Sequence, residues 1–293
     1  MNAALDTTRL RGGPIKRFGG KGRNAPRIVP HFARANVYAE ACLGAGGVFF
    51  RVPEGAYRFA AVNDLDGSLV TFFRALRDRP DDLVRACSLT PYSLTEFVAA
   101  LDHTDDPLEE ARRVWVRSRQ SFSGRGETWG RCPGQGDPLA RAGSNWNAGA
   151  TAAKLDTLHA FARRLLDVSI DCIDGAEFIA KWGREGTMVY VDPPYVASTR
   201  KGDAYLHELN DDGHRRFAAA CHGAVERGAR VAVSGYPSAL YDALYAGWRR
   251  IDIDVALHGT RHTRGQRRTE SLWLSYPASE EIGAGPLSLT EGT

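Results

Sequence analysis

The chain has 293 residues, of which 43% are apolar and 25% are charged, and its formal net charge is +3 at pH 7. These values are ordinary for a globular protein of one large or two smaller domains. No apolar run approaches the roughly 18 residues that a membrane span needs, and the first residues lack the apolar core of a signal peptide.

The cysteines are few and scattered. There are five, with no CxxC pair among them: Cys42, Cys87, Cys132, Cys172 and Cys221. An odd set of this kind argues against a disulfide framework or a cysteine zinc site, and it predicts a reducing, cytoplasmic location.

The first part of the chain predicts two strand–helix units. Residues 1–35 are basic and rich in glycine and proline. Residues 36–50, "NVYAEACLGAGGVFF", then predict a short strand, a glycine turn and the start of a helix. A second strand over 57–66, "YRFAAVNDLD", precedes a helix over 67–78.

The character of the chain changes between about residues 90 and 167. Helical stretches at 93–102 and 108–120 are followed by a long polar, glycine-rich segment at 121–149 and a further helix at 150–167. Loops of this length are usually functional or disordered. This middle part is expected to form an insertion into the sheet or a lobe on it.

Strands and helices alternate again from residue 168. Strands are predicted at 168–174, 186–192, 229–235 and 270–276, with helices near 208–227 and 237–247. Such alternation predicts an α/β fold with a mostly parallel sheet and helices on both faces.

The glycine turn after the first strand has the features of a cofactor site. Glu40 ends the strand, and Gly44 and Gly46 allow a ligand to approach the backbone closely. Asp64 follows Gly46 by 18 residues at the end of the second strand, where nucleotide-binding folds place an acidic residue against a ribose. The fuller GxGxxG pattern is absent, which favours a nucleoside with an amino-acid tail over a dinucleotide.

The stretch "VDPPY" ends the strand predicted at 186–192. Asp192, Pro193, Pro194 and Tyr195 would lie at the carboxyl end of the sheet, where open α/β sheets bind ligands. A carboxylate, a rigid carbonyl and an aromatic face suit an amino-substituted heterocycle. The alternative is an ordinary proline turn.

In this order, the motifs resemble those of the Dam-like DNA adenine-N6 methyltransferases over nearly the whole chain. The N-terminal "FGGK", Phe18, Gly19, Gly20 and Lys21, is similar to the family's methionine-binding motif. "EACLGAGG" is similar to its glycine motif, with Ala41-Cys42 in place of Pro-Phe, "VNDLD" to its acidic motif, and "DPPY" to its catalytic motif. Asp174 matches the residue beside the cofactor's adenine.

The resemblance implies a Rossmann-like catalytic domain of the S-adenosylmethionine-dependent type, made of residues 1–85 and 168–280. Residues 86–167 would be an inserted, largely helical lobe that recognises the DNA target, and 281–293 a tail. The resemblance also implies S-adenosyl-L-methionine as cofactor and DNA as partner. It further implies that the target base is flipped out of the duplex and that the methyl group is transferred directly, assisted by Asp192 and the Pro193 carbonyl. The segment that reads GATC in well-known members has no match here, so no target sequence is carried over.

Clustered arginines predict DNA contacts. They occur in the N-terminal segment, around 112–131 and in 258–268, and the residues predicted to bind DNA are Arg119, Arg125, Arg261 and Arg264. For each cluster the alternative is a solvated face. Trp129 and Trp146 serve either to pack the lobe or to stack on bases. His258 and His262 have no accompanying carboxylate or cysteine cluster, so no metal site is predicted.

Three rival functions remain open from the sequence. They are an RNA adenine methyltransferase, a cytosine-N4 enzyme, and a catalytically silent DNA-binding protein. The sequence does not determine whether a partner restriction endonuclease exists.

Overall fold

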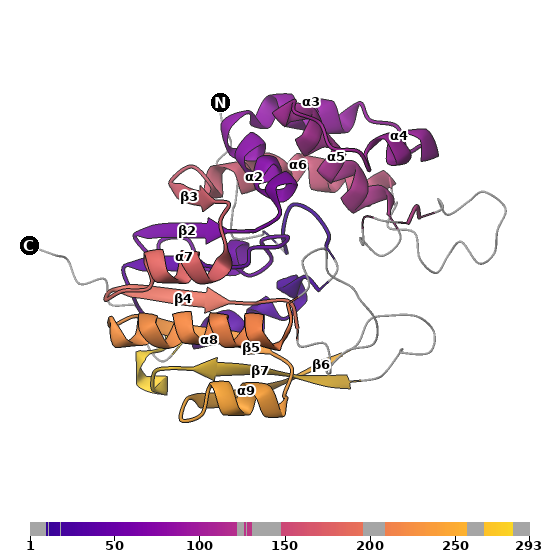
Figure 1. Ribbon diagram of the computed structural model, residues 1–293. Helices are drawn as coiled ribbons and strands as arrows, with labels where there is room; N and C mark the ends of the chain where they lie inside the picture. The colour runs from indigo at the N-terminus through magenta and orange to yellow at the C-terminus, as the bar shows by residue number, and fades with distance from the viewer. Residues whose placement is uncertain are drawn as a thin grey trace, which may run out of the picture.

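One sheet organises the structure, which is a computed structural model (Figure 1). It describes residues 10, 12–17, 19–121, 126, 128–130, 148–195, 209–256 and 267–283, with the side chains of α6 from Lys154 onward. Within these residues the strand order is β3-β2-β1-β4-β5-β7-β6. The strands are β1 (Val37–Glu40), β2 (Phe59–Asn63), β3 (Val168–Asp171), β4 (Thr187–Val191), β5 (Arg230–Gly235), β6 (Arg249–Ala256) and β7 (Arg267–Leu274). Strands β1 to β5 pair in parallel, and β7 is antiparallel to both β5 and β6.

The central strands are apolar on both faces. Every residue of β4 is buried, as expected for a parallel strand covered on both sides. Tyr38 and Tyr190 pack into the core on one face, whereas Ala39 and Val189 pack into the core on the other. The period of two sends neighbouring side chains to opposite faces. The predicted mostly parallel sheet with helices on both faces is confirmed.

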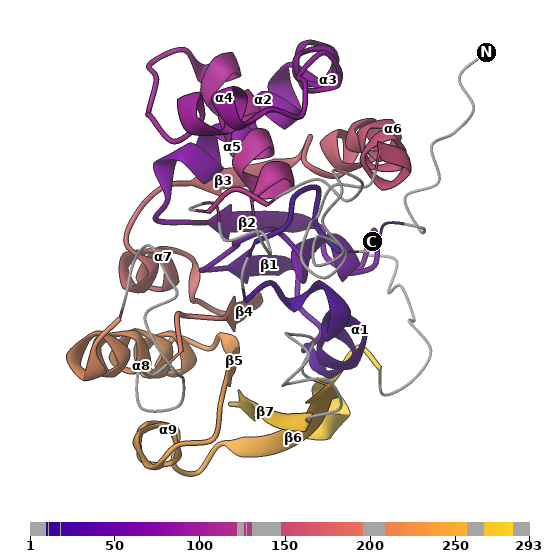
Figure 2. The ribbon, with the colours of Figure 1, turned by 90° about the vertical axis from the view of Figure 1, so that its right-hand side faces the viewer.

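The helices divide between the two faces and the β3 end of the sheet. Figure 2 looks onto the carboxyl ends of the parallel strands, with α7, α8 and α9 on one face and α1 on the other. Helices α2 to α5 gather beyond β3, and α6 lies beside them. The helices are α1 (Ala25–Ile28), α2 (Gly67–Asp78), α3 (Pro80–Ser88), α4 (Leu94–Ala99), α5 (Pro107–Gln120), α6 (Ala148–Arg164), α7 (Gly175–Trp182), α8 (Asp211–Glu226) and α9 (Ala239–Leu244).

The segment after the glycine turn differs from expectation. Instead of a helix it forms a single 3₁₀ turn, Phe49–Arg51. Pro53 follows closely, and a proline disfavours the helical conformation in the residue before it. The rings of Phe49 and Phe50 are buried in the core, so this short turn serves packing.

The predicted recognition lobe shares a core with the rest of the molecule. Leu83 of α3, Trp115 of α5 and Phe161 of α6 belong to the same buried cluster as Phe72 of α2 and Tyr38 of β1. The boundary at residue 86 therefore falls inside a continuous apolar core.

No helix in the described ranges is long and apolar enough to cross a membrane.

Candidate active site

The site lies at the carboxyl ends of β1, β2 and β4. The turn after β1 needs glycine, because Gly44 and Gly46 have φ values of +54° and +73°, which L side chains rarely adopt. The turn is fixed to the neighbouring strand, since the Leu43 amide donates to the Asn63 carbonyl oxygen at 2.8 Å.

Asp64 connects the glycine turn to the end of β2. Its Oδ2 accepts a hydrogen bond from the Gly44 amide at 2.8 Å, and its Oδ1 accepts one from the Asp66 amide at 3.0 Å. Burial raises the pKa of this carboxyl, although nearby Arg17 acts in the opposite direction. The carboxylate lines a cavity, at the place where the sequence predicted a ribose-binding acid.

Asp174 borders the same cavity from the start of α7. Its Oδ1 caps the helix by accepting from the Ala176 and Glu177 amides at 2.9 and 3.2 Å. Its Oδ2 pairs with Arg216 of α8, which also lines the cavity. The carboxylate is thus held in place by two elements.

Most of the predicted site residues surround this one cavity. Of the predicted catalytic and cofactor residues, those that line it are Gly19, Gly20, Lys21, Glu40, Gly44, Asp64, Asp174, Asp192, Pro193 and Pro194. Gly46 and Tyr195 lie next to lining residues without lining it themselves. Phe18 is outside the described residues.

Asp192 is oriented through one of its two oxygens. Its Oδ1 accepts from Lys21 Nζ at 2.7 Å and from Ser234 Oγ at 2.8 Å. The Ser234 Oγ in turn lies 3.0 Å from the hydroxyl of Tyr190 on the adjacent strand β4. No residue in the described ranges bonds to Oδ2, and Asp192 lines the cavity.

Lys21 joins the N-terminal segment to two carboxylates. Besides Asp192 it pairs with Glu270 Oε1 at 3.1 Å. Burial acts to lower the pKa of this ammonium, but the charges of Asp192 and Glu270 outweigh it and hold the pKa well above its ordinary value. Burial raises the pKa of the Asp192 carboxyl, despite the opposing charge of Lys21. Lys21 therefore stays protonated and compensates a buried negative charge.

Tyr195 is only 6% exposed. Its hydroxyl donates to Glu270 Oε1 at 2.9 Å and also contacts Lys21 Nζ. Glu270 Oε2 accepts from Asn24 Nδ2 at 2.8 Å. These contacts hold Tyr195 between the N-terminal segment and β7.

A family model for D12 class N6 adenine-specific DNA methyltransferases matches residues 18–256. The chain belongs to this family. Its members methylate adenine N6 in DNA, and the D12-class enzyme described here uses S-adenosyl-L-methionine. The resemblance found in the sequence motifs is confirmed, and so is the predicted methyltransferase type of fold.

Individual relatives are distant. The D12-class chain is 24% identical over 285 residues to the type II methyltransferase M1.LlaDCHI of Lactococcus lactis subsp. cremoris, covering 88% of this chain and 93% of the relative. Among solved structures, the rRNA methyltransferase aviRa from Streptomyces viridochromogenes is 15% identical, with coverage of 97% and 94% and a TM-score of 0.35. Precorrin 8W decarboxylase from Methanobacterium thermoautotrophicum is 11% identical, with coverage of 87% and 89% and a TM-score of 0.33.

The residues around the cavity fit S-adenosylmethionine. The glycine-lined turn lets a ligand approach the backbone, and a Cβ at Gly47 would come within 2.6 Å of the Gly22 amide nitrogen. Asp64 and Asp174 supply acceptors for hydroxyl and amine groups, while Leu209 and Phe217 supply apolar surface. Cys42 lines the cavity where the family motif has phenylalanine, so this wall is built from a smaller side chain.

Glu40 is buried beneath the cavity. Its Oε2 accepts from the Tyr38 hydroxyl at 2.7 Å. Burial raises the pKa of Glu40 well above its ordinary value, and the hydrogen bond from Tyr38 only partly offsets this.

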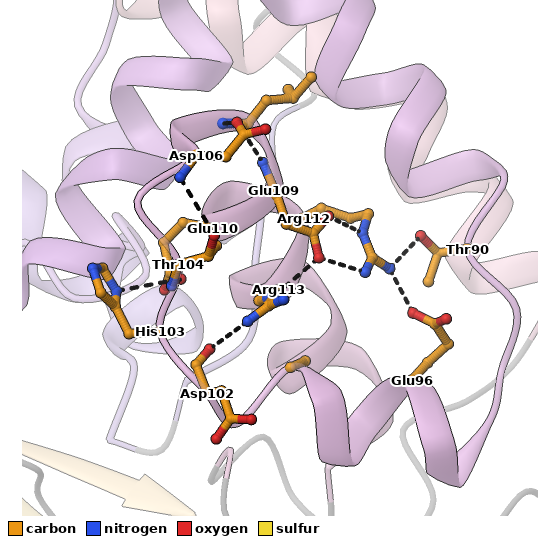
Figure 3. A network of polar contacts seen from close by, with 12 residues as sticks. Thr90, Glu96, Asp102, His103, Thr104, Asp106, Glu109, Glu110, Arg112 and Arg113 are labelled. Carbon is orange, nitrogen blue, oxygen red and sulfur yellow. Dashed lines mark hydrogen bonds and ion pairs between the residues drawn. The ribbon is translucent and has the colours of Figure 1, made fainter.

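Arg112 and Arg113 of α5 form ion pairs with acidic residues of the lobe (Figure 3). Arg112 pairs with Glu109 at 2.7 Å and with Glu96 at 2.8 Å, and Arg113 pairs with Glu109 at 2.9 Å. Arg117 pairs with Glu110 at 3.0 Å. These pairs favour the alternative of a structural role for this part of the cluster.

Arg119, predicted to bind DNA, is 5% exposed. Its guanidinium lies 4.6 Å from the centre of the Trp115 ring, and it donates to the Pro14 carbonyl oxygen at 3.3 Å. This placement gives the prediction of a DNA contact no support. Arg125, Arg261, Arg264, His258, His262 and Trp146 lie outside the described residues. Trp129 packs against Tyr92, with ring centroids 5.7 Å apart.

Three site residues were not singled out in the sequence: Ser234, Glu270 and Asn24. Glu270 carries a detectable signal, since it is a carboxylate that begins the apolar run "ESLWLSY". Ser234 precedes the glycine that ends β5, as a small polar residue after "VAV". Asn24 carries no such signal, because its role depends on the path of the N-terminal segment.

Proposed function

We propose that this D12-class enzyme holds a flipped-out adenine with Asp192 Oδ2 and the Pro193 carbonyl, each accepting one hydrogen of the N6 amine. The orientation of Asp192 is the observation that carries the proposal. Its Oδ1 is occupied by Lys21 and Ser234, while Asp192 and Pro193 both border the cavity. Two fixed acceptors beside a nucleoside-sized site suit an exocyclic amine.

The chemistry follows from the poor nucleophilicity of that amine. Its lone pair is delocalised into the ring, so acceptors on both hydrogens favour a more tetrahedral nitrogen. S-adenosylmethionine supplies the methyl group from its sulfonium. As the bond from nitrogen to the methyl carbon forms, the bond from that carbon to the sulfonium sulfur would break and leave a neutral thioether. Positive charge then develops on nitrogen, and ionised Asp192 stabilises it. The nitrogen then releases a proton, for which Asp192 is the nearest acceptor. Catalysis on this account is positioning and preorganised charge.

The cofactor roles are assigned by position. Asp64 would accept from the ribose hydroxyls and Asp174 from the adenine amine. Gly19, Gly20 and Lys21 would surround the methionine part together with Glu40 and the glycine turn. Tyr195 would stack on the flipped base. Residues 86–167 would serve as the target-recognition lobe, with Arg125, Arg261 and Arg264 on DNA phosphates.

A restriction–modification context is the biological role that we propose. The support is the similarity to the relative from Lactococcus lactis, which is a type II methyltransferase. On this proposal the enzyme protects DNA from a partner endonuclease. The cytoplasmic location stays a prediction.

Methyl transfer with a tritiated cofactor tests the function. Duplex DNA that lacks adenine methylation is expected to gain label, and nucleoside chromatography should place it in N6-methyldeoxyadenosine. Single-stranded DNA and RNA serve as comparison substrates. Label found in RNA alone, or in N4-methyldeoxycytidine, would contradict the assignment, and so would a folded, cofactor-binding protein that labels no nucleic acid.

A further inference from the structure

Tyr236 is an aromatic residue at the site that the proposed function leaves unused. It follows β5 directly, two residues after Ser234. Its ring lies against the ring of Tyr195, with centroids 4.2 Å apart and planes tilted by 54°. Tyr236 thus covers the residue expected to stack on the target base.

The two rings leave no space for a third. Aromatic pairs in direct contact already lie at about 4.5–7 Å between centroids, whereas these centroids are 4.2 Å apart. Tyr195 as a whole is 6% exposed. A base can therefore stack on Tyr195 only after one of its neighbours has moved.

The neighbours of Tyr195 differ in how firmly they are held. Lys21 is fixed by its ion pairs with Asp192 and Glu270, and Glu270 also accepts from Asn24. Within the described residues, Tyr236 makes ring contacts with Tyr195 and with Arg268, whose guanidinium carbon lies 3.7 Å from the ring centre. Tyr236 is half-buried. Unlike a displacement of Lys21, a displacement of Tyr236 breaks none of the ion pairs among these residues.

We propose that the flipped adenine enters between Tyr195 and Tyr236. Tyr236 occupies the stacking position in the free enzyme, gives up its contact with Tyr195 as the base enters, and then forms the second wall of the base pocket. Arg268, whose guanidinium lies over the ring of Tyr236, supports that wall. The inference rests on the proposed function, in which Tyr195 stacks on the target base.

Nuclear magnetic resonance tests the displacement directly. In enzyme with protonated tyrosine rings on a deuterated background, the Tyr195→Phe and Tyr236→Phe variants assign the two rings. A nuclear Overhauser peak between them is expected in the free protein. It should vanish when S-adenosylhomocysteine and a duplex that the wild-type enzyme methylates are bound. A peak that persists in this complex would overturn the proposal, because Tyr236 would then only support Tyr195 from behind.

Kinetics provide a second test. Tyr236→Ala should lower kcat by about tenfold or more, the scale expected from losing a base-stacking ring. Its affinities for DNA and S-adenosylmethionine should stay the same, since DNA remains bound through its phosphates. Tyr236→Phe keeps the ring and should stay within about twofold of wild type. Tyr236→Ala with wild-type kcat would also overturn the proposal.

A matched control separates packing from function. Tyr57 is another partly buried tyrosine, packed on Tyr38 with centroids 5.4 Å apart and away from the cavity. Tyr57→Ala is expected to lower the melting temperature and leave kcat unchanged.

A wild-type enzyme that methylates no DNA would count against the proposed function itself. A ring contact that persists in a complex able to methylate DNA would count only against the proposed role of Tyr236.

Discussion

At the scale of single residues, four carboxylates that line the cavity are held by partners of different kinds. Asp192 has a lysine, Asp174 an arginine, Asp64 two backbone amides, and Glu40 a tyrosine hydroxyl. An ion pair compensates charge in a way that a neutral donor does not. The four acids should therefore respond differently to substitution and to pH.

Asp64→Ala tests the cofactor assignment. If this carboxylate accepts from the ribose hydroxyls, its removal should weaken S-adenosylmethionine binding by about 1.5–3 kcal/mol, the range for a hydrogen bond to a charged group. Titration calorimetry measures the change. Asp171→Ala is the control, because Asp171 ends the adjacent strand β3 but pairs with Lys181 outside the cavity. Equal affinities in folded Asp64→Ala and wild type would remove Asp64 from the site.

Glu40→Gln tests whether burial raises the pKa of the Glu40 carboxyl. The folded-state pKa of Glu40 is raised, so the folded protein binds a proton more tightly at this group than the unfolded chain does. The ordinary pKa of this carboxyl is near 4.5. As the pH rises from that value toward the raised pKa of the folded state, the stability of the wild type should therefore fall relative to that of Glu40→Gln. We expect the melting-temperature advantage of Glu40→Gln to grow between pH 5 and pH 8. A constant difference across this range would mean that Glu40 titrates normally.

At the scale of elements, helix α5 shows why a cluster of arginines is an ambiguous signal. Glu109 lies one turn before Arg112 and Arg113, at the spacing that allows pairs within a helix. Glu110 pairs with Arg117, two turns further on. The hydrogen bond from Arg112 lowers the pKa of Glu109 to about 2, with Arg113 adding to the effect against a smaller opposing contribution from desolvation. The net charge of a segment does not reveal which of its arginines are already paired.

Salt dependence distinguishes the paired arginines from predicted DNA contacts. Arg125→Ala should weaken DNA binding and reduce the slope of log affinity against log salt concentration by about 1. Arg112→Ala, which breaks pairs with Glu109 and Glu96, should lower stability and leave that slope unchanged. Cofactor affinity should not change in either variant. A reduced slope for Arg112→Ala together with an unaltered slope for Arg125→Ala would reverse the two roles.

At the scale of the whole molecule, the shared core makes the lobe part of one folding unit. Phe161 of α6 packs edge-on against Phe50 beside the glycine turn, with ring centroids 4.8 Å apart. Unfolding of the lobe would therefore expose the core beneath the cofactor site. Calorimetry should show one cooperative transition. Two separated transitions would mean that the lobe is an independent domain.

The sequence predicts six of the seven strands in the described residues because its signals are local, and it misses the edge strand β6 (Arg249–Ala256). Alternation of apolar strands and amphipathic helices indicates the α/β class, and strand-end acids such as Asp64 and Asp192 come together at the carboxyl edge of a parallel sheet. The contacts of Glu270 and Asn24 could not be predicted in this way. The two residues are far apart in the chain, and only the path of the N-terminal segment across β7 brings them to Tyr195. The contact between Tyr195 and Tyr236 likewise depends on side-chain packing.

The central claim is that Asp192 positions the amine and stabilises its developing positive charge, and Asp192→Asn tests it most directly. Asparagine keeps the size and one acceptor oxygen but loses the charge, so the variant should fold, bind S-adenosylmethionine and DNA, and transfer at most a trace of methyl groups. Initial rates with tritiated cofactor and duplex DNA are measured for the wild type and the variant, after their melting temperatures have been shown to be equal. If Asp192 served only a proline turn, asparagine would replace it well. An Asp192→Asn enzyme with wild-type melting temperature and wild-type turnover would contradict the account.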